Sequence, residues 1–340
     1  MQYKSIDNLP LIEWIDLKTV RDSRRALLCT TVSAEKLFID FLKSFNFVKK
    51  IYIESADELV VNKIIKDRKT DIEVIYALGG GKVNDVARYI AYKWKIDIIS
   101  IPTILSTDAF LVNCTGLRSK GCVKYIPSKK ATKVFLDLSI LKKSSPRYHL
   151  SGCGDVLSIY TALFDWKYTI KKRKAKSDEK YSPFMEEVAM AIFNGLLLEA
   201  GEIKRLSKKG FTVIVNSLAM EVQLCNLYGN SRPEEGGEHF FTYCIENKLQ
   251  NFLHGEMVSF GVLLTSFLQK QKWLVLKNFM DVIGLNYKPD NLNKSIVLET
   301  LNEMQAYVRM HKLRYSIYND FIFDDKKKQV EKFLNILEIF

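Results

Sequence analysis

Apolar positions in the first part of the chain follow two alternating patterns. Short apolar runs predict strands at residues 26–29, 51–53, 73–78 and 97–101. Between these runs, apolar side chains recur every three or four residues and predict helices at 34–38, 60–65 and 83–94. Strands that alternate with helices at this spacing are typical of a parallel sheet covered on both faces. We therefore predict an α/β domain in this part of the chain.

The pattern changes after Pro146. The strand signal fades, and wide apolar faces with almost no proline predict helices at 156–166, 184–206, 213–227, 254–270 and 297–307. We therefore divide the chain into an α/β domain over residues 1–148 and an all-α domain over residues 149–340.

Composition narrows the class of protein. Of the 340 residues, 47% are hydrophobic and 26% are charged, which excludes a mainly disordered chain, a coiled coil and a collagen-like repeat. No apolar run approaches the ~18 residues of a membrane span, and the first residues lack the apolar core of a signal peptide. We expect a cytoplasmic protein without a membrane-spanning segment.

The charge balance favours anionic ligands. The chain carries 51 Lys and Arg against 39 Asp and Glu, a formal net charge of +12. Such an excess attracts nucleic acids and phosphorylated metabolites alike. The densest basic run, residues 171–176, is followed at once by Asp178 and Glu179, which favours a solvated loop between two helices over a nucleic-acid site. We therefore expect no nucleic-acid partner.

Three consecutive glycines, Gly79, Gly80 and Gly81, separate the strand at 73–78 from the helix that follows it. Glycines let the backbone approach a ligand closely, and the helix behind them presents unpaired N–H groups, so this turn suits a pyrophosphate. The segment is neither a P-loop nor the G-x-G-x-x-G fingerprint. A tight connection without any ligand explains the glycines equally well.

A polar loop follows the strand at 97–101. Thr103, Ser106, Thr107 and Asp108 lie just after this strand, and open α/β sheets bind ligands outside the carboxyl ends of their strands. The alternative is a loop whose hydroxyls and carboxylate cap its own backbone. The residues alone leave both interpretations open.

Asp155, His239 and His254 are the candidate metal ligands. Two histidines and one carboxylate fill three positions on Zn²⁺ or Fe²⁺ and leave a further position for substrate. Each histidine lies at a predicted helix start, and Asp155 lies at the predicted domain boundary, where capping a helix is the alternative role. The cysteines are scattered without a C-x-x-C pair, which argues against a thiolate zinc site.

Five segments, in this order, resemble the dehydroquinate-synthase-like superfamily: GGGKVNDVARY (79–89), SIPTILSTDA (100–109), SGCGDVLS (151–158), GGEHFF (236–241) and LHGEMVSFG (253–261). The superfamily includes the iron-containing alcohol dehydrogenases, the glycerol dehydrogenases and the glycerol-1-phosphate dehydrogenases. The GCGD box, the Asp165-Trp166 pair that follows it and the GGEH box are most similar to the glycerol-1-phosphate dehydrogenases. The STDA segment is nearer to the glycerol dehydrogenases.

The resemblance implies a Rossmann-like N-terminal domain that binds a dinucleotide and a helical C-terminal domain that binds metal and substrate. Asp155, His239 and His254 match the family's metal positions, usually occupied by Zn²⁺, with Fe²⁺ or Ni²⁺ as alternatives. The residues that the resemblance assigns to the cofactor are Thr30, Gly79, Gly80, Gly81, Lys82, Asp85, Thr103 and Ser106. It places Asp108 beside the nicotinamide and the substrate, and gives it a catalytic role together with the three metal ligands.

The resemblance leaves the choice of cofactor open. Family members that require NAD often carry an acidic residue after the first strand, where this chain has Thr30 and Thr31. Nothing there repels a 2′-phosphate, so NADPH is expected to be accepted. Glu54, after the second strand, keeps NADH open.

On this basis we predict a metal-dependent enzyme that uses NADPH or NADH to reduce dihydroxyacetone phosphate to sn-glycerol 1-phosphate. The resemblance places this activity in phospholipid biosynthesis, and we expect a homo-oligomer. Two alternatives stay open. One is a dehydrogenase of an unphosphorylated polyol or alcohol, and the other is a lyase of the dehydroquinate synthase type.

Overall fold

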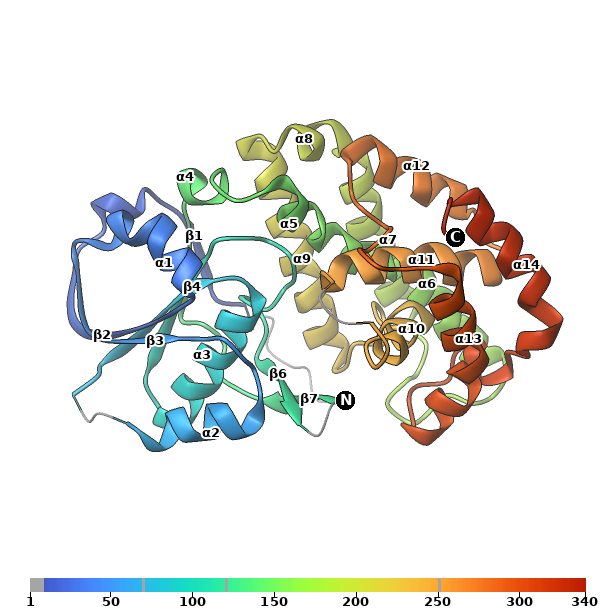
Figure 1. Cartoon of the computed structure of the whole chain (residues 1–340), viewed down its shortest axis with the longest axis horizontal. Helices are drawn as coiled ribbons and strands as arrows, with labels where there is room; N and C mark the ends of the chain where they lie inside the picture. The colour runs from blue at the N-terminus through green and yellow to red at the C-terminus, as the bar shows by residue number, and fades with distance from the viewer. Residues whose placement is uncertain (1–8, 69–70, 120–121, 250–251) are drawn as a thin grey trace. The chain divides into compact units, whose positions relative to one another are not determined.

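The computed structural model describes residues 9–340 apart from 69–70, 120–121 and 250–251. The described chain separates into two compact units, residues 9–148 and residues 149–340. The first unit contains the sheet, and the second is helical throughout its described part (Figure 1). An α/β unit with a parallel sheet, followed by a helical unit, confirms the predicted fold class.

The main sheet of the first unit is parallel throughout. Its described strands are β1 (Leu11–Trp14), β2 (Asp22–Thr30), β3 (Phe45–Tyr52), β4 (Val74–Gly79), β5 (Asp97–Pro102) and β8 (Lys133–Leu136). They lie in the order β1-β8-β5-β4-β2-β3. The chain runs outward from β2 to β3 and then returns to β4 on the other side of β2, so the strand order reverses between β2 and β4. Open sheets bind ligands outside the carboxyl ends of the strands at such a point.

The helices around this sheet begin where the sequence supplies a cap. They are α1 (Val32–Phe38), α2 (Glu58–Lys66) and α3 (Gly81–Trp94), with α4 (Leu138–Leu141) following β8. Thr31 accepts a hydrogen bond from the Ala34 N–H at the start of α1, and Asp57 caps α2 in the same way. β4 is buried along its whole length, as a strand covered on both faces requires.

Two parts of this unit have no counterpart among the predicted strands: the pair β1 and β8 at one side of the sheet, and a small hairpin. β1 and β8 have four residues each, and β1 is half-exposed at the sheet edge, so it lacks a clear apolar run. The antiparallel hairpin of β6 (Cys114–Ser119) and β7 (Cys122–Pro127) lies beside α3. Arg88 of α3 is fully buried and donates to the carbonyls of Val112 and Cys114, both at 2.7 Å, which fastens the hairpin to the helix.

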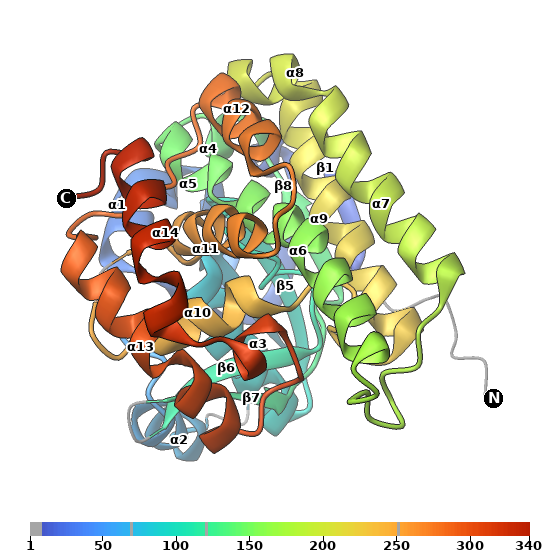
Figure 2. The ribbon, with the colours of Figure 1, turned by 90° about the vertical axis from the view of Figure 1, so that its right-hand side faces the viewer.

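The second unit packs its helices side by side. α6 (Gly152–Lys171) contacts both α10 (Gly237–Ile245) and α11 (His254–Leu268), and these three form the centre. α6 and α11 are buried along most of their length because neighbouring helices surround them. α7 (Pro183–Leu198) and α9 (Lys208–Tyr228) lie beside α6 (Figure 2).

The remaining helices extend this arrangement. They are α8 (Ala200–Arg205), α12 (Trp273–Ile283), α13 (Lys294–Met310) and α14 (Phe323–Ile336), with a 3₁₀ turn at Ile317–Asp320. The short helix α5 (Pro146–Leu150) spans the division between the two units, and the 3₁₀ turns at Leu17–Thr19 and Ile39–Leu42 belong to the first unit. The prediction of one helix over 184–206 is wrong. α7 and α8 are separate because Glu199 leaves helical geometry, with φ −102° and ψ 21°. The basic run at 171–176 is a largely exposed connection after α6, as predicted.

α9 is, by length and composition alone, apolar enough to cross a membrane. Of its most apolar window, 61% is buried inside the structure, and α9 packs against α6, α7 and α8. A core helix passes the same test, so this packing accounts for the apolar character of α9.

Candidate functional site

Two glycines bring the start of α6 against the start of α11. A Cβ atom added to Gly154 would lie 2.1 Å from the Gly255 carbonyl oxygen, and one added to Gly255 would lie 1.8 Å from the Ser151 carbonyl oxygen. No larger residue fits at either position without moving the backbone. Asp155 follows Gly154 and His254 precedes Gly255, so this contact brings the two side chains to the same place.

A third close contact adds α10. A Cβ atom on Gly261 of α11 would lie 2.6 Å from the Glu238 carbonyl oxygen. The Gly237 N–H at the start of α10 donates to Asp165 Oδ2 on α6 at 2.8 Å, so α6 supplies the cap that α10 lacks. The imidazole rings of His239 and His254 consequently lie side by side, with centroids 5.6 Å apart.

The structure brings Asp155, His239 and His254 together. One donor atom from each lies within 4.8 Å of the other two. Asp155 and His239 are largely buried, and His254 is half-buried. Ser151 occupies the N-cap position of α6, and Asp155 lies within the first turn, so capping the helix is not what Asp155 does. The helix-cap alternative left open by the sequence is therefore excluded.

A carboxylate faces the rear of each imidazole. Glu238 Oε1 lies 3.0 Å from His239 Nδ1, and Glu246 Oε1 lies 4.0 Å from His254 Nδ1. With Nδ1 facing a carboxylate, Nε2 is the nitrogen left to bind a cation. Neither glutamate was among the residues predicted from the sequence to form the site. Adjacency to His239 was an available signal for Glu238, whereas Glu246 reaches His254 only through the fold.

The electrostatics of the cluster favour positive charge. Burial raises the pKa of Asp155, although the charges of His254 and His239 act against it. Burial acts to lower the pKa of His239, but the hydrogen bond and charge of Glu238 outweigh it and raise the pKa to about 9. Burial also acts to lower the pKa of His254, but the hydrogen bond of Glu246 and the charge of Asp155 outweigh it and raise the pKa. A metal ion bound here would displace protons from both imidazoles.

These residues fit a divalent cation. Asp155 Oδ1 is buried and accepts no hydrogen bond from the described residues. Two imidazole nitrogens and one carboxylate oxygen are a donor set that Zn²⁺, Fe²⁺ and Ni²⁺ accept. In the part of the chain that the structure describes, this is the one group of three such side chains with metal-like spacing.

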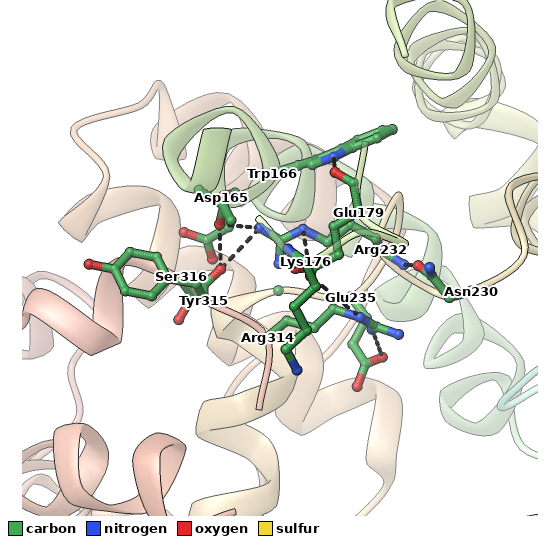
Figure 3. A network of polar contacts seen from close by, with 12 residues as sticks. Asp165, Trp166, Lys176, Glu179, Asn230, Arg232, Glu235, Arg314, Tyr315 and Ser316 are labelled. Carbon is green, nitrogen blue, oxygen red and sulfur yellow. Dashed lines mark hydrogen bonds and ion pairs between the residues drawn. The ribbon is translucent and has the colours of Figure 1, made fainter. Parts of the chain in front are cut away.

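Two arginines tie together the chain segments around α10 (Figure 3). Arg232 and Arg314 each place Nε 3.8 Å from Oε1 of the buried Glu179. Arg232 also donates to the Tyr315 carbonyl at 3.0 Å, and Arg314 pairs with Glu235 at 2.8 Å. These contacts join the loop after α6, the segment before α10 and the loop after α13. They therefore fix the chain that leads into α10.

The predicted cofactor residues lie at the carboxyl ends of the central strands β2, β4 and β5. Thr30 ends β2, and its hydroxyl donates to the Leu78 carbonyl of β4 at 2.9 Å. Thr103 follows β5, and its N–H donates to the Gly79 carbonyl at 3.2 Å. Gly80 is the N-cap of α3, so the first amides of that helix lie beside the glycine turn. The carboxyl ends of β2 and β4, between which the strand order reverses, are among them.

The glycine turn also packs against the polar loop after β5. A Cβ atom on Gly80 would lie 2.7 Å from Ile104 Cδ1, and one on Gly81 would lie 3.0 Å from Thr107 Oγ1. Ser106 and Asp108 flank Thr107 and are half-buried. Close packing therefore accounts for part of the need for glycine, and a role in binding a pyrophosphate stays a prediction.

Lys82 and Asp85 have protein partners of their own. The Lys82 ammonium donates to the Glu54 carbonyl, after β3, at 3.1 Å. Asp85 Oδ1 lies 2.5 Å from Arg88 Nη2. Burial raises the pKa of Asp85 to about 7 against the charge of Arg88, and the charge of Asp108 adds to the rise. Asp85 thus stabilises the buried Arg88, and its contact with a cofactor stays a prediction.

Known proteins match this chain in sequence. A profile of the family described as iron-containing alcohol dehydrogenase matches residues 40–145. The glycerol-1-phosphate dehydrogenase (NAD(P)+) of Aeropyrum pernix is 29% identical over 279 residues, which cover 80% of this chain and 75% of that protein.

Solved structures share the fold. The iron-containing alcohol dehydrogenase of Corynebacterium glutamicum aligns with a TM-score of 0.69 at 11% identity, covering 97% of this chain and 96% of that one. The 2-epi-5-epi-valiolone synthase of Streptomyces hygroscopicus, solved with NAD+ and Zn²⁺ bound, aligns with a TM-score of 0.64 at 14% identity, covering 93% and 92%. The chain is therefore similar in sequence to the iron-containing alcohol dehydrogenases and the glycerol-1-phosphate dehydrogenases and shares the dehydroquinate-synthase-like fold, and these matches indicate an NAD(P)-dependent dehydrogenase.

Proposed function

We propose that the protein is a metal-dependent glycerol-1-phosphate dehydrogenase, which reduces dihydroxyacetone phosphate to sn-glycerol 1-phosphate with NADPH or NADH. The observation that carries the proposal is the convergence of Asp155, His239 and His254, in a chain 29% identical to a glycerol-1-phosphate dehydrogenase. The buried Asp155 Oδ1, which accepts no hydrogen bond from the described residues, supports a cation at this point.

In this proposal, Asp155 Oδ1 and the Nε2 atoms of His239 and His254 hold Zn²⁺, with Fe²⁺ and Ni²⁺ as alternatives. The bound cation would supply Lewis acidity to the substrate oxygen. The protein's contribution is a fixed spacing of the donors, because the backbones of Gly154 and Gly255 are in contact next to two of them. Burial of the cluster restricts access of water to the ion.

The carboxyl edge of the sheet would take the dinucleotide, which supplies the hydride. The turn at Gly79–Gly81 and the first amides of α3 suit the pyrophosphate, and Thr103 and Ser106 lie in the loop beside them. Asp108 keeps its predicted catalytic role in the same loop. Thr30 and Thr31 place no carboxylate after β2, which supports use of NADPH as well as NADH.

A panel of substrates and cofactors tests the function. Oxidation of NADPH and of NADH by the zinc-loaded protein is followed with dihydroxyacetone phosphate, dihydroxyacetone and a simple aldehyde. We expect the phosphorylated ketone to be strongly preferred, and the product to be the 1-phosphate by a stereospecific assay. The KM for dihydroxyacetone phosphate should rise with salt, because exposed charges are screened within about 8 Å at physiological ionic strength. Equal turnover of both ketones without a salt effect would assign the protein to the polyol dehydrogenases.

We also infer a homo-oligomer in the cytoplasm. NADPH and dihydroxyacetone phosphate are intracellular metabolites, which supports the location. On α7, Phe184 is 69% exposed and Leu198 is 85% exposed, and large apolar side chains in such positions support contact between subunits. Sedimentation velocity of the purified protein tests the assembly.

A further inference from the structure

Glu238 is fully buried, at 0% exposure, one residue before His239 in the first turn of α10. Its Oε1 accepts the Gly236 N–H at 2.6 Å and faces His239 Nδ1 at 3.0 Å. Its Oε2 accepts the Thr161 hydroxyl of α6 at 2.7 Å. Donors from two parts of the fold therefore hold both oxygens of this carboxylate.

These contacts determine which nitrogen of His239 carries a proton. Glu238 Oε1 already accepts the Gly236 N–H, so we assign Nδ1 of His239 as the donor in its contact with this oxygen. Once the ring is neutral, Nε2 keeps the lone pair that a cation requires. Rotation of the ring would break a buried hydrogen bond to a carboxylate that is itself held in place.

We infer that Glu238 is a positioning residue of the metal centre: it fixes the ring and the tautomer of His239 so that Nε2 faces the cation shared with Asp155 and His254. The inference rests on the proposed metal-dependent function. It adds a residue that acts only through His239 and touches neither the cation nor the substrate.

Glu246 offers a matched control on the other histidine. Its Oε1 lies 4.0 Å from His254 Nδ1, and its side chain is 19% exposed. By comparison, Glu238 Oε1 lies 3.0 Å from His239 Nδ1, and the Glu238 side chain is 0% exposed. A longer contact that water can reach constrains an imidazole less than a short buried one. His239 is therefore the more rigid of the two ligands.

Three variants separate positioning from a general role in stability. Glu238→Gln keeps an oxygen for the Gly236 N–H and His239 Nδ1, and turns its amide group toward the Thr161 oxygen. Glu238→Leu has a similar size but removes every acceptor. Glu246→Gln changes the weaker contact. Zinc dissociation constants are measured on metal-free protein by competition with a chelator, and circular dichroism checks the fold of each variant.

We expect Glu238→Leu to weaken zinc binding by roughly 10- to 100-fold, the range for partners that orient a metal-bound histidine. Glu238→Gln should restore most of the affinity, and Glu246→Gln should change it less than Glu238→Leu does. Equal zinc affinity in the wild type and Glu238→Leu would overturn the inference while leaving the metal centre intact. A wild-type protein that binds no zinc would overturn the metal-dependent function itself, and the inference with it.

A measurement on the zinc-loaded wild type covers the case in which Glu238→Leu does not fold. Nitrogen-15 NMR of the imidazoles distinguishes a protonated nitrogen from a zinc-bound one. A protonated Nδ1 and a zinc-bound Nε2 on His239, retained in Glu238→Gln, support the inference. Zinc on Nδ1 of His239 overturns it.

Discussion

His254 Nε2 lies 3.8 Å from Asp155 Oδ1, too far for a hydrogen bond and close enough for one cation to contact both atoms. Zn²⁺ binds nitrogen and oxygen at about 2.0–2.2 Å, so two of its ligand atoms can be up to about 4 Å apart. Asp155→Asn keeps the shape of the side chain and removes its charge. We expect zinc affinity to fall by more than the roughly 10- to 100-fold that follows loss of an orienting partner. Metal content after dialysis, measured by mass spectrometry, checks this.

The same variant should be more stable than the wild type when both are free of metal. Burial raises the pKa of Asp155, so the folded protein disfavours its charged form at neutral pH. A neutral amide removes that penalty. We expect a higher thermal midpoint for metal-free Asp155→Asn than for metal-free wild type, and the reverse order with zinc. A variant that is less stable in both states would show that Asp155 is a structural residue.

The contact between Gly154 and Gly255 should be intolerant of any side chain. Gly255→Ala would place Cβ 1.8 Å from the Ser151 carbonyl, so the helices must separate. We expect a loss of about 1–3 kcal/mol in the free energy of unfolding, as for other overpacked sites. Zinc affinity should fall as well, because His254 moves away from Asp155. Denaturant unfolding and chelator competition measure the two effects.

Gly195 of α7 is the matched control for that substitution. Among the described residues, no atom outside its chain neighbours and the backbone of its own helix lies within 4 Å of a Cβ built on it, so alanine meets open space there. We expect Gly195→Ala to raise stability by about 0.5–1 kcal/mol through the lower entropy of the unfolded chain, with zinc affinity unchanged. If both alanines had the same effect, close packing at Gly255 would not be what brings the site together.

The pattern of apolar residues predicted the centre of each unit but not its edges. β4 and β5 are buried strands, so their apolar runs are nearly uninterrupted. β1 is short and half-exposed, and its residues have no pattern that separates it from a loop. α7 and α8 form one apolar stretch in the sequence, and only the backbone at Glu199 divides them.

The residue types of the candidate metal site were visible in the sequence, whereas the contacts that bring them together were not. Two histidines and an aspartate suggested a cation, but their sequence separation left their proximity unproven. The cap that Asp165 gives to Gly237 joins residues 72 positions apart. Such contacts depend on the packing of three helices, and no local pattern encodes them.

The glycine turn of the first unit provides a test with a built-in control. Gly80→Val would bring a branched side chain toward both the expected pyrophosphate and Ile104, whose Cδ1 would lie 2.7 Å from the new Cβ atom. We expect affinity for NADH and NADPH to fall at least tenfold, about 1.4 kcal/mol, by calorimetry. The double variant with Ile104→Ala relieves the internal clash. Full recovery of binding in the double variant would show that the glycine serves only packing.

Stability toward acid should depend on Asp22 in β2. Arg24 donates to its carboxylate through Nη2 at 2.6 Å and Nε at 3.0 Å, and the Tyr76 hydroxyl donates as well. Burial acts to raise the pKa of Asp22, but these hydrogen bonds outweigh it and lower the pKa from 3.8 to about 2. A carboxyl group with a lower pKa in the folded state stabilises the fold above its unfolded pKa. This contribution is lost as the pH falls from about 4 to about 2.

Asp22→Asn should therefore lower the free energy of unfolding by about 2 kcal/mol at pH 7, since each pKa unit corresponds to ~1.4 kcal/mol. The difference from wild type should shrink as the pH falls below 4, because the wild-type carboxylate then takes up a proton. Urea unfolding of both proteins at several pH values from 7 downward measures this difference. Asp40→Asn is the control, because the Asp40 side chain is 72% exposed and its ion pair with Lys43 is open to water. A constant difference for Asp22→Asn across this range would mean that the amide loses packing rather than charge.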